Sequence, residues 1–259
     1  MFLTELFEAT ERRVVVIYSG RFQPFHLGHA KVYQYLVSKY GRNNVYIGTS
    51  NKVEAPDSPF SFADRLYFMQ LMGIPADRVL EIPRPYNKEE AVRALGISSA
   101  EEANIILIFP VSAKDMHGDP KLGIPPDPRF SKFTKKDGQP TWTQPLPPAG
   151  HQVNGMDQSA YIEEVPTYPF KVLGKSVTGA TSIREMYSAG DEAQRQQIIK
   201  DLYGKYTPEA EKLMTDRLMA PPVEKPAKPV KLPKPLKPQG GLDKIAVKQQ
   251  RAGKKAVGV

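Results

Sequence analysis

Apolar stretches of strand length alternate with helix-like segments along this chain, and that alternation limits the folds open to it. The strand candidates are residues 13–19, 44–49, 78–82 and 104–109, and apolar side chains recur at helical spacing in residues 28–40, 61–72, 87–95 and 181–203. Strands that alternate with helices form βαβ units, whose right-handed crossovers build a parallel sheet with helices on both faces. The sequence therefore predicts an α/β fold with a parallel sheet.

A proline-rich stretch interrupts this alternation after the fourth strand. Nine prolines lie between positions 110 and 148, where the sequence shows little periodicity. Long irregular segments in compact domains are commonly functional, so we interpret residues 111–160 as an insertion that covers the site. The turn Asp137-Gly138 predicts a small hairpin within it. Trp142, the one tryptophan of the chain, is expected to anchor local packing, with stacking on a base as the alternative.

The net charge of +8 comes from the end of the sequence. Residues 1–220 hold 26 basic and 26 acidic side chains, whereas residues 221–259 hold 10 basic and 2 acidic ones. The overall charge of residues 1–220 therefore does not indicate nucleic-acid binding. Repeated Lys and Pro in the tail predict a disordered, solvated segment. The alternative is a tether to nucleic acid or to an acidic protein surface.

Composition excludes several classes of chemistry and location. The chain has no cysteine, which excludes disulfides, thiolate catalysis and Cys-ligated metals. No apolar run approaches the roughly 20 residues needed to span a bilayer, and residues 1–13 do not resemble a secretory signal. We expect a cytoplasmic protein without membrane contact. The sequence leaves a homo-oligomer open.

Residues 20–29, Gly-Arg-Phe-Gln-Pro-Phe-His-Leu-Gly-His, lie between the first predicted strand and the first predicted helix. This order places two imidazoles at the carboxyl end of a strand and beside a helix N-terminus, where backbone N–H groups attract phosphate. Gly20 and Gly28 let the backbone approach a phosphate closely. The alternatives are a zinc site, for which no third ligand is evident, and a pair of capping or core histidines. The segment indicates nucleotide chemistry.

These residues resemble the His-x-Gly-His signature of the nucleotidyltransferase superfamily. The full form is similar to that of nicotinamide mononucleotide adenylyltransferases of archaeal type. Residues 179–184, Gly-Ala-Thr-Ser-Ile-Arg, stand where the family has Ser-Ser-Thr-x-Ile-Arg or Ser-Gly-Thr-x-Ile-Arg, and residues 59–65 resemble the Pro-Phe-x-x-x-x-Arg that opens its second helix. The resemblance covers about residues 13–200 without the insertion. It implies a Rossmann-like nucleotidyltransferase fold.

The resemblance also implies an activity, the transfer of AMP from ATP to a phosphorylated acceptor with release of pyrophosphate. The implied acceptor is nicotinamide mononucleotide, the product NAD, and the metal a Mg²⁺ ion carried by ATP, without a metal site of the protein's own. One alternative is a cytidylyl- or adenylyltransferase with another acceptor. The other is a structural or DNA-associated protein that keeps the fold without turnover.

The site residues follow from the matched motifs. The resemblance implies catalytic roles for His26, His29 and Arg184. It implies nucleotide contacts for Gly20, Arg21, Phe22, Gly28, Thr181 and Ser182, with the last two also capping their helix. Acceptor contacts are expected from Arg65, Arg84 and Tyr86.

Two further segments need a separate interpretation. Gly179 and Ala180 stand where the family has serines, so Ser176 or Thr178 is expected to supply the missing hydroxyls. The cluster of Asp115, His117 and Asp119 resembles a metal site, but we expect a solvated loop.

The sequence predicts four parts of the chain. These are an N-terminal extension (1–12), a nucleotidyltransferase domain (13–205), a C-terminal helix (206–220) and the basic tail (221–259). Residues 1–11 predict an amphipathic helix packed on the domain. Alternatively, Leu6-Phe7-Glu8 before Ala9 resembles the cleavage sites in capsid-targeting peptides of tailed bacteriophages, which would imply a phage-encoded, virion-associated enzyme.

Overall fold

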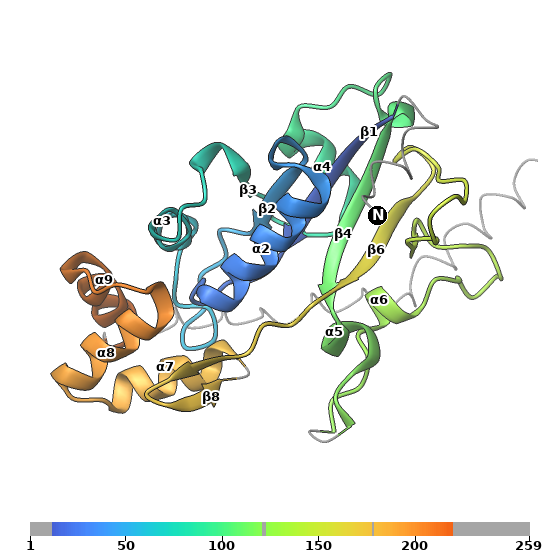
Figure 1. Cartoon of the computed structure of the whole chain (residues 1–259). Helices are drawn as coiled ribbons and strands as arrows, with labels where there is room; N and C mark the ends of the chain where they lie inside the picture. Colours follow the sequence, from blue (N-terminus) through green and yellow to red (C-terminus); the bar gives the residue numbers. More distant parts are fainter. Residues whose placement is uncertain (1–11, 121–122, 178, 220–259) are drawn as a thin grey trace, which may run out of the picture. The chain divides into compact units, whose positions relative to one another are not determined.

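The computed structural model describes residues 12–219 except 121–122 and 178 (Figure 1). The expectations for the N-terminal helix, for cleavage before Ala9, for a disordered or tethering tail and for Thr178 all lie outside the described residues. Among the described helices, none combines the length and the apolar character needed to cross a membrane.

Six parallel strands form the central sheet, in the order β3-β2-β1-β4-β6-β5. They are β1 (Arg13–Ser19), β2 (Val45–Thr49), β3 (Val79–Glu81), β4 (Ile105–Ser112), β5 (Thr143–Pro145) and β6 (Ala160–Val165). The chain runs outward from β1 through β2 to β3 and then returns to β4 on the other side of β1. Ligands of open α/β sheets bind where the strand order reverses in this way, at the carboxyl ends of the strands.

Helices cover both faces of the sheet (Figure 1). The helices of the described residues are α2 (Leu27–Tyr40), α3 (Phe62–Leu71), α4 (Lys88–Leu95), α5 (Ala113–His117), α6 (Pro128–Ser131), α7 (Ala180–Ala189), α8 (Glu192–Tyr203) and α9 (Pro208–Leu218). Short 3-10 turns, η1 (Arg42–Asn44), η2 (Ala76–Arg78) and η3 (Glu102–Asn104), precede β2, β3 and β4, and β7 (Phe170–Val172) pairs with β8 (Lys175–Val177) in a separate hairpin.

The side chains of β1 alternate between two apolar clusters. Val14 and Val16 join a cluster that includes buried residues of α2, α3, α7, α8 and α9, whereas Val15 and Ile17 join one that includes Ala91 of α4. Successive strand residues point to opposite faces, so an apolar run such as residues 14–17 is buried on both sides. The predicted α/β fold with a parallel sheet and helices on both faces is confirmed.

The segment predicted as one helix over residues 181–203 is two helices. α7 ends before Gly190, and Asp191 then caps α8 by accepting from the backbone N–H of Gln194. The side-chain oxygen of Gln194 in turn accepts from the backbone N–H of Asp191, which completes a capping box. The new cap explains why the helical pattern restarts at this point.

The proline-rich insertion is more ordered than its sequence indicates. It contains α5, α6 and β5. The predicted hairpin around Asp137-Gly138 is present, with an antiparallel bridge between Thr134 and Pro140. Trp142 packs against Phe109, and its Nε1 donates to the carbonyl of Met156 at 3.0 Å, so it anchors local packing as expected.

Strand β6 is absent from the sequence prediction because it carries two consecutive glutamates. Glu163 is nevertheless only 7% exposed, since Lys39 forms an ion pair with it and the hydroxyl of Tyr40 donates to it at 2.6 Å. Burial and the neighbouring carboxylate raise the pKa of Tyr40. A partner on α2 thus lets an acidic residue sit in a buried strand.

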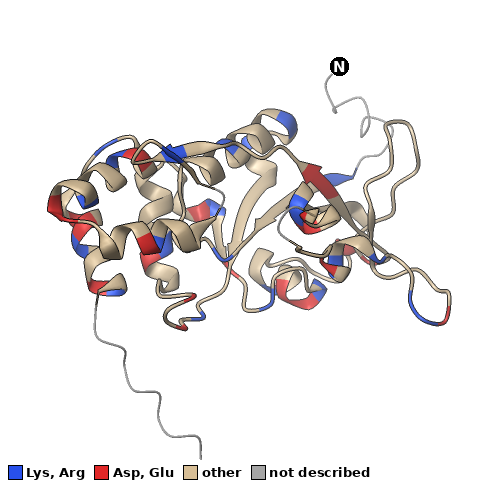
Figure 2. Cartoon of the chain, turned by 90° about the horizontal axis from the view of Figure 1, so that it is seen from below, with Lys and Arg blue, Asp and Glu red and all other residues tan. Residues whose placement is uncertain are grey.

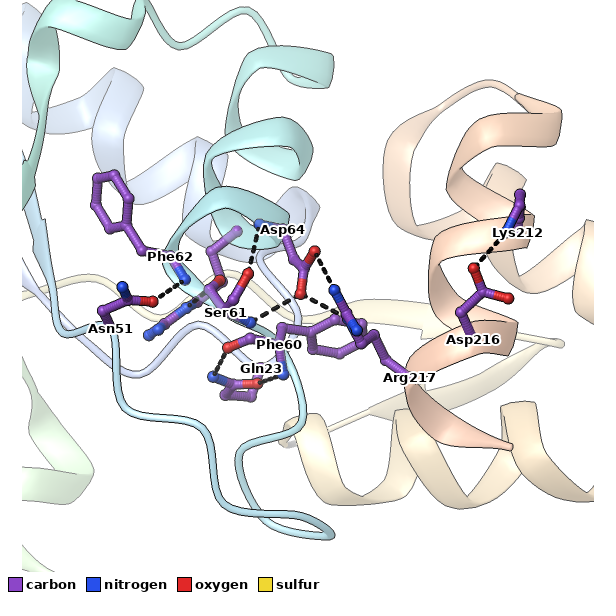
Figure 3. A network of polar contacts seen from close by, with 10 residues as sticks. Gln23, Asn51, Phe60, Ser61, Phe62, Asp64, Lys212, Asp216 and Arg217 are labelled. Atoms are coloured by element: carbon purple, nitrogen blue, oxygen red, sulfur yellow. Dashed lines mark hydrogen bonds and ion pairs between the residues drawn. The ribbon is translucent and has the colours of Figure 1, made fainter. Parts of the chain in front are cut away.

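Arg217 ties the C-terminal helix α9 to the start of α3 (Figure 3). Its guanidinium donates to both carboxylate oxygens of Asp64, at 2.8 and 3.2 Å. Asp64 also accepts from the backbone N–H of Ser61 in the capping box of α3. Burial alone would raise the pKa of Asp64, but these bonds together lower it.

We predict that Arg217→Ala lowers the free energy of unfolding by about 1 kcal/mol, because a two-pronged bond to a buried cap residue is lost. Lys212→Ala is the matched control on the same helix, since it removes only the exposed pair with Asp216 (Figure 3). That change should cost about 0.3 kcal/mol. Urea titration measures both, and equal effects would contradict the proposed role of Arg217.

Candidate active site

A cavity of about 740 Å³ lies at the carboxyl ends of β1 and β4, where the strand order reverses. Segments distant in the sequence line it: residues 18–23, the start of α2, Asp57, Tyr86, residues 110–115, residues 165–170 and the start of α7. In the view from below (Figure 2), basic and acidic residues are interspersed over the described chain.

The two motif histidines face each other in this cavity. His26 is the N-cap residue of α2 and His29 lies in its first turn, and their rings stack with centroids 3.7 Å apart. Phe22 packs against His29 and Phe170 against His26. Burial in this aromatic surrounding lowers the pKa of His26 to about 3 and that of His29 well below its usual value. Both imidazoles are therefore neutral near pH 7.

Three buried polar atoms at the cavity lack a hydrogen-bond partner. They are Ser19 Oγ, His26 Nδ1 and His29 Nδ1, and they are three of the five such side-chain atoms among the described residues. A buried polar atom left unpaired costs about 1–3 kcal/mol. Their grouping around one cavity indicates a polar ligand.

Two guanidinium groups reach the same cavity. Arg184, in the first turn of α7, donates to the carbonyl of Gln23 at 2.9 Å and to Thr181 Oγ1 at 3.3 Å. Arg21 is exposed and lines the cavity as well. Burial lowers the pKa of Arg184, but an arginine still keeps its charge at neutral pH. The structure thus brings His26, His29 and Arg184 together around one space, as the sequence motifs predict.

Gln23 joins the first motif to the segment before α3. Its side-chain amide donates to the carbonyl of Phe60 at 3.0 Å and accepts from the backbone N–H of Phe60 at 2.9 Å (Figure 3). The carbonyl of Gln23 holds Arg184 at the same time. One residue therefore connects all three matched motifs.

The glycines of the first motif make room for aromatic rings. A Cβ on Gly28 would lie 3.1 Å from the His26 ring, and one on Gly20 would lie 2.7 Å from the ring of Phe22. Phe22 itself has a left-handed backbone, with φ 49°, which is strained for a bulky residue. Packing around the histidines therefore explains both glycines without invoking a phosphate.

Two of the four arginines expected in the site, Arg65 and Arg84, do not line the cavity. Arg65 is only 1% exposed and donates to four oxygens of the protein: the carbonyls of Ser61, Arg21 and Ser50 and the hydroxyl of Thr49. The expectation that Arg65 binds the acceptor is corrected, because its donors already hold the backbone beside the site. Arg84 is exposed and pairs with Glu90, so it does not line the cavity either.

Tyr86 does line the cavity, in a strained conformation with φ 68°. Its hydroxyl donates to the carbonyl of Ser19 at 3.0 Å. The rings of Phe109 and Phe130 pack edge-on against it. These contacts hold the ring at the end of β1.

The start of α7 differs from the expected capping. Gly179 is the N-cap residue and supplies no side-chain cap, while Thr181 and Ser182 lie in the first turn. Thr181 lines the cavity and accepts from Arg184, whereas Ser182 and Ser176 do not line it. The first N–H groups of α7 therefore remain available at the cavity.

The residues at the end of β6 and after it are not among those that the sequence motifs predict for the site. Residues 165–170 line the cavity, and Phe170 contacts the ring of His26. Tyr18, Ser19 and Asp57 were missed as well. The position of residues 165–170 after a strand of the parallel sheet is the signal that could have found them, but β6 itself was not predicted.

Of the described residues of the insertion, only some of the first nine line the cavity. Ser112, Lys114, Asp115 and Asp119 line it at the end of β4. His117 pairs instead with Glu164 at 2.8 Å. No group of three or more His, Asp or Glu in the described parts of the chain is placed to hold a metal ion.

A family model described as cytidylyltransferase-like matches residues 17–119, which include β2, β3, β4 and the histidine motif. Nicotinamide-nucleotide adenylyltransferase 1 of Sulfolobus acidocaldarius is 37% identical to this chain over 54 residues, which are 21% of this chain and 31% of that protein. The corresponding enzyme of Saccharolobus solfataricus is 30% identical over 73 residues, 27% of this chain and 42% of that protein. The chain thus spans about a third of the length of the curated relatives it matches.

Two solved structures are similar over 79% of this chain. A bifunctional NMN adenylyltransferase/ADP ribose pyrophosphatase from Francisella tularensis, complexed with AMP and a manganese ion, is 17% identical, with a TM-score of 0.41 and 48% of that chain covered. Nicotinic acid mononucleotide adenylyltransferase of Plasmodium falciparum, complexed with NaAD, is 10% identical, with a TM-score of 0.42 and 96% of that chain covered.

We predict that the protein without ligand loses stability as the pH falls below 6.5. The unfolded chain binds protons on His26 and His29 near their usual pKa, whereas the folded chain does not until near pH 3 for His26. Stability present above pH 6.5 is therefore lost on acidification, by about 1.4 kcal/mol per pH unit for each histidine. Urea unfolding at pH 7 and pH 5 measures this loss. Between pH 7 and pH 5, the double variant His26→Gln/His29→Gln should lose much less free energy of unfolding than the wild type or the control variant His151→Gln. If the double variant loses as much as the wild type, the two buried histidines are not the cause of the acid sensitivity.

We predict that Arg65→Lys lowers the free energy of unfolding by about 3 kcal/mol, because an ammonium group cannot reach the acceptors that the planar guanidinium joins. Arg84→Lys, at an exposed site, should change it by less than about 0.5 kcal/mol. Chemical denaturation compares the two variants. A mild effect of Arg65→Lys together with a raised KM for the acceptor would instead restore Arg65 as a substrate contact.

Proposed function

We propose that the protein transfers AMP from ATP to nicotinamide mononucleotide, forming NAD and releasing pyrophosphate. The observation that carries the proposal is the grouping of Ser19, His26 and His29, each with an unpartnered polar atom, together with Arg21 and Arg184 around one cavity. That cavity lies where an α/β sheet binds phosphates.

The reaction needs positioned donors more than a nucleophile of the protein. A phosphate oxygen of the acceptor attacks the α-phosphorus of ATP, a new P–O bond forms, and the bond to the bridging oxygen of pyrophosphate breaks. The attacking oxygen is already an anion, so no residue has to deprotonate it. Catalysis then consists of bringing anions together and stabilising the charge that builds up on the phosphates.

The residues of the cavity suit that task. His26 and His29 are neutral and each can donate one N–H to a phosphate oxygen without adding a buried charge. Arg184 and Arg21 supply the positive charge for the leaving pyrophosphate. The N-termini of α2 and α7, with Thr181, add further donors. Mg²⁺ enters with ATP, as part of the substrate.

The identity of the acceptor is supported by sequence similarity. The archaeal relatives are named nicotinamide-nucleotide adenylyltransferases, and residues 20–29 of this chain resemble the motif of adenylyltransferases of that type. The proposal extends that activity to this chain. A cytidylyltransferase is the alternative that the family model's description raises.

We predict that the purified protein releases pyrophosphate from ATP only when nicotinamide mononucleotide is present. His29→Ala and Arg184→Ala should each lower kcat by about 10²–10³-fold, the usual loss for one donor to a transition-state anion. His151→Ala is the matched control, because His151 is exposed and contacts only the nearby carbonyl of Pro148.

The assay should compare ATP with CTP, and nicotinamide mononucleotide with phosphopantetheine and phosphorylated alcohols. Turnover with CTP alone would replace the proposal by a cytidylyltransferase. If His29→Ala leaves every measured activity unchanged, the catalytic role of the cavity is wrong.

A further inference from the structure

The cavity carries groups of opposite charge in different places. The histidine pair, Arg21 and Arg184 gather where β1 meets the starts of α2 and α7. Asp115, in α5, and Asp119, two residues after that helix, line the cavity beyond the end of β4. Figure 1 shows α5 and α7 well apart along the carboxyl edge of the sheet. A bound molecule that spans the cavity would meet cations at one end and carboxylates at the other.

Asp115 is held in a defined orientation. Its Oδ2 accepts from the hydroxyl of Ser112 at 2.9 Å, and its carbonyl accepts from the backbone N–H of Asp127 at 2.9 Å. Its Oδ1 has no hydrogen-bond partner among the described residues. The carboxylate is thus fixed by its own segment and keeps one oxygen for a ligand.

Two tyrosine rings of the cavity lie within the electrostatic reach of this carboxylate. Burial is the largest cause of the raised pKa values of Tyr18 and Tyr86, and the charge of Asp115 raises both further. Tyr86 is fixed by its bond to Ser19 and by the rings of Phe109 and Phe130. The acidic end of the cavity therefore combines a carboxylate with aromatic side chains, a combination that suits a cationic aromatic ring.

The nearby cations do not cancel this charge. The guanidinium of Arg129, over the ring of Tyr86, is bound to both carboxylate oxygens of Asp127. Lys114 lines the cavity but is an exposed, flexible side chain. Asp115 itself forms no ion pair with another residue that the structure describes.

We infer that Asp115 is a specificity-determining residue, which selects an acceptor whose ring carries a pyridinium cation and a neutral carboxamide over the analogue whose ring carries a carboxylate. The inference rests on the proposed function. With the acceptor's phosphate between the histidines and the guanidinium groups, its ring extends toward the acidic end. The carboxamide N–H₂ can donate to Asp115 Oδ1, whereas a ring carboxylate in the same place would face a like charge.

The test compares nicotinamide mononucleotide with nicotinic acid mononucleotide as acceptors for the wild type and for Asp115→Asn. We expect the wild type to prefer the amide in kcat/KM, and Asp115→Asn to lower the amide-to-acid ratio about 10-fold or more, mainly through the KM values of the two acceptors. The KM for ATP should not change. Calorimetric titration of each mononucleotide without ATP should show the same shift in the ratio of Kd values.

Two control variants remove one carboxylate charge, as Asp115→Asn does, but at other positions. Asp137→Asn, in the hairpin of the insertion and outside the cavity lining, should leave activity and selectivity unchanged. Asp57→Asn removes a carboxylate that lines the cavity 3.9 Å from Arg184, at the cationic end. Its amide-to-acid ratio should stay at the wild-type value, whatever happens to the rate.

The outcomes separate this inference from the proposed function. If the wild type turns over a mononucleotide acceptor but Asp115→Asn keeps the wild-type ratio, the role of Asp115 is wrong and the proposed function stands. If Asp115→Asn changes only the KM for ATP, the role of Asp115 in acceptor selection is also wrong, because that result places the adenine ring at the acidic end of the cavity. If the wild type turns over and binds neither mononucleotide, the proposed function and this inference both fail. Thermal melting of Asp115→Asn confirms that the variant is folded.

Discussion

The hydrogen bond from Arg184 to the carbonyl of Gln23 is the contact on which the site depends. It spans 161 positions of the sequence and joins the start of α7 to the residues before α2. Gln23 can accept this bond in place because its side chain is fixed on both sides by the backbone of Phe60. Without this connection, the first and last motifs would be anchored to separate parts of the fold. With it, the imidazoles and the guanidinium face one space.

Burial sets the chemistry of that space. The aromatic rings around His26 and His29 remove water from them, so the imidazoles stay neutral while the guanidinium groups keep their charge. Neutral donors and a few fixed cations suit a polyanionic ligand, because two further buried cations would repel each other in the empty site. The cost of the arrangement is visible in the unpartnered ring nitrogens and in the strained backbone of Phe22 and Tyr86.

Periodicity and local motifs predict the part of the fold that local sequence determines. β1 follows from an apolar run and α2 from apolar side chains at helical spacing, and both patterns are local to the sequence. β6 escaped prediction because Glu163 is compatible with a buried strand only when Lys39 and Tyr40, more than 120 positions away, neutralise and bond it. No window around residue 163 contains that information.

The arginines show the same limit within the site. Arg65 and Arg184 each lie in the first turns of a helix and each belongs to a matched motif, so the sequence gives them equal standing as ligands of a phosphate. Their roles differ because Arg65 is surrounded by carbonyl groups at the end of β2, whereas the donors of Arg184 are only partly used by Gln23 and Thr181. The protein oxygens around an arginine therefore decide whether its donors hold the backbone beside the site or remain available to a ligand.

The start of α7 lacks the serines that the resembling family has at positions 179 and 180. Serines would be tolerated there, since a Cβ on Gly179 would meet no atom within 4 Å. Steric exclusion therefore does not explain the glycine. What the glycine does is leave the first turn of α7 without a side-chain cap, so that its backbone N–H groups have no competitor within the helix. A phosphate bound there would act as the cap, and the binding of the anion would complete the helix that carries Arg184.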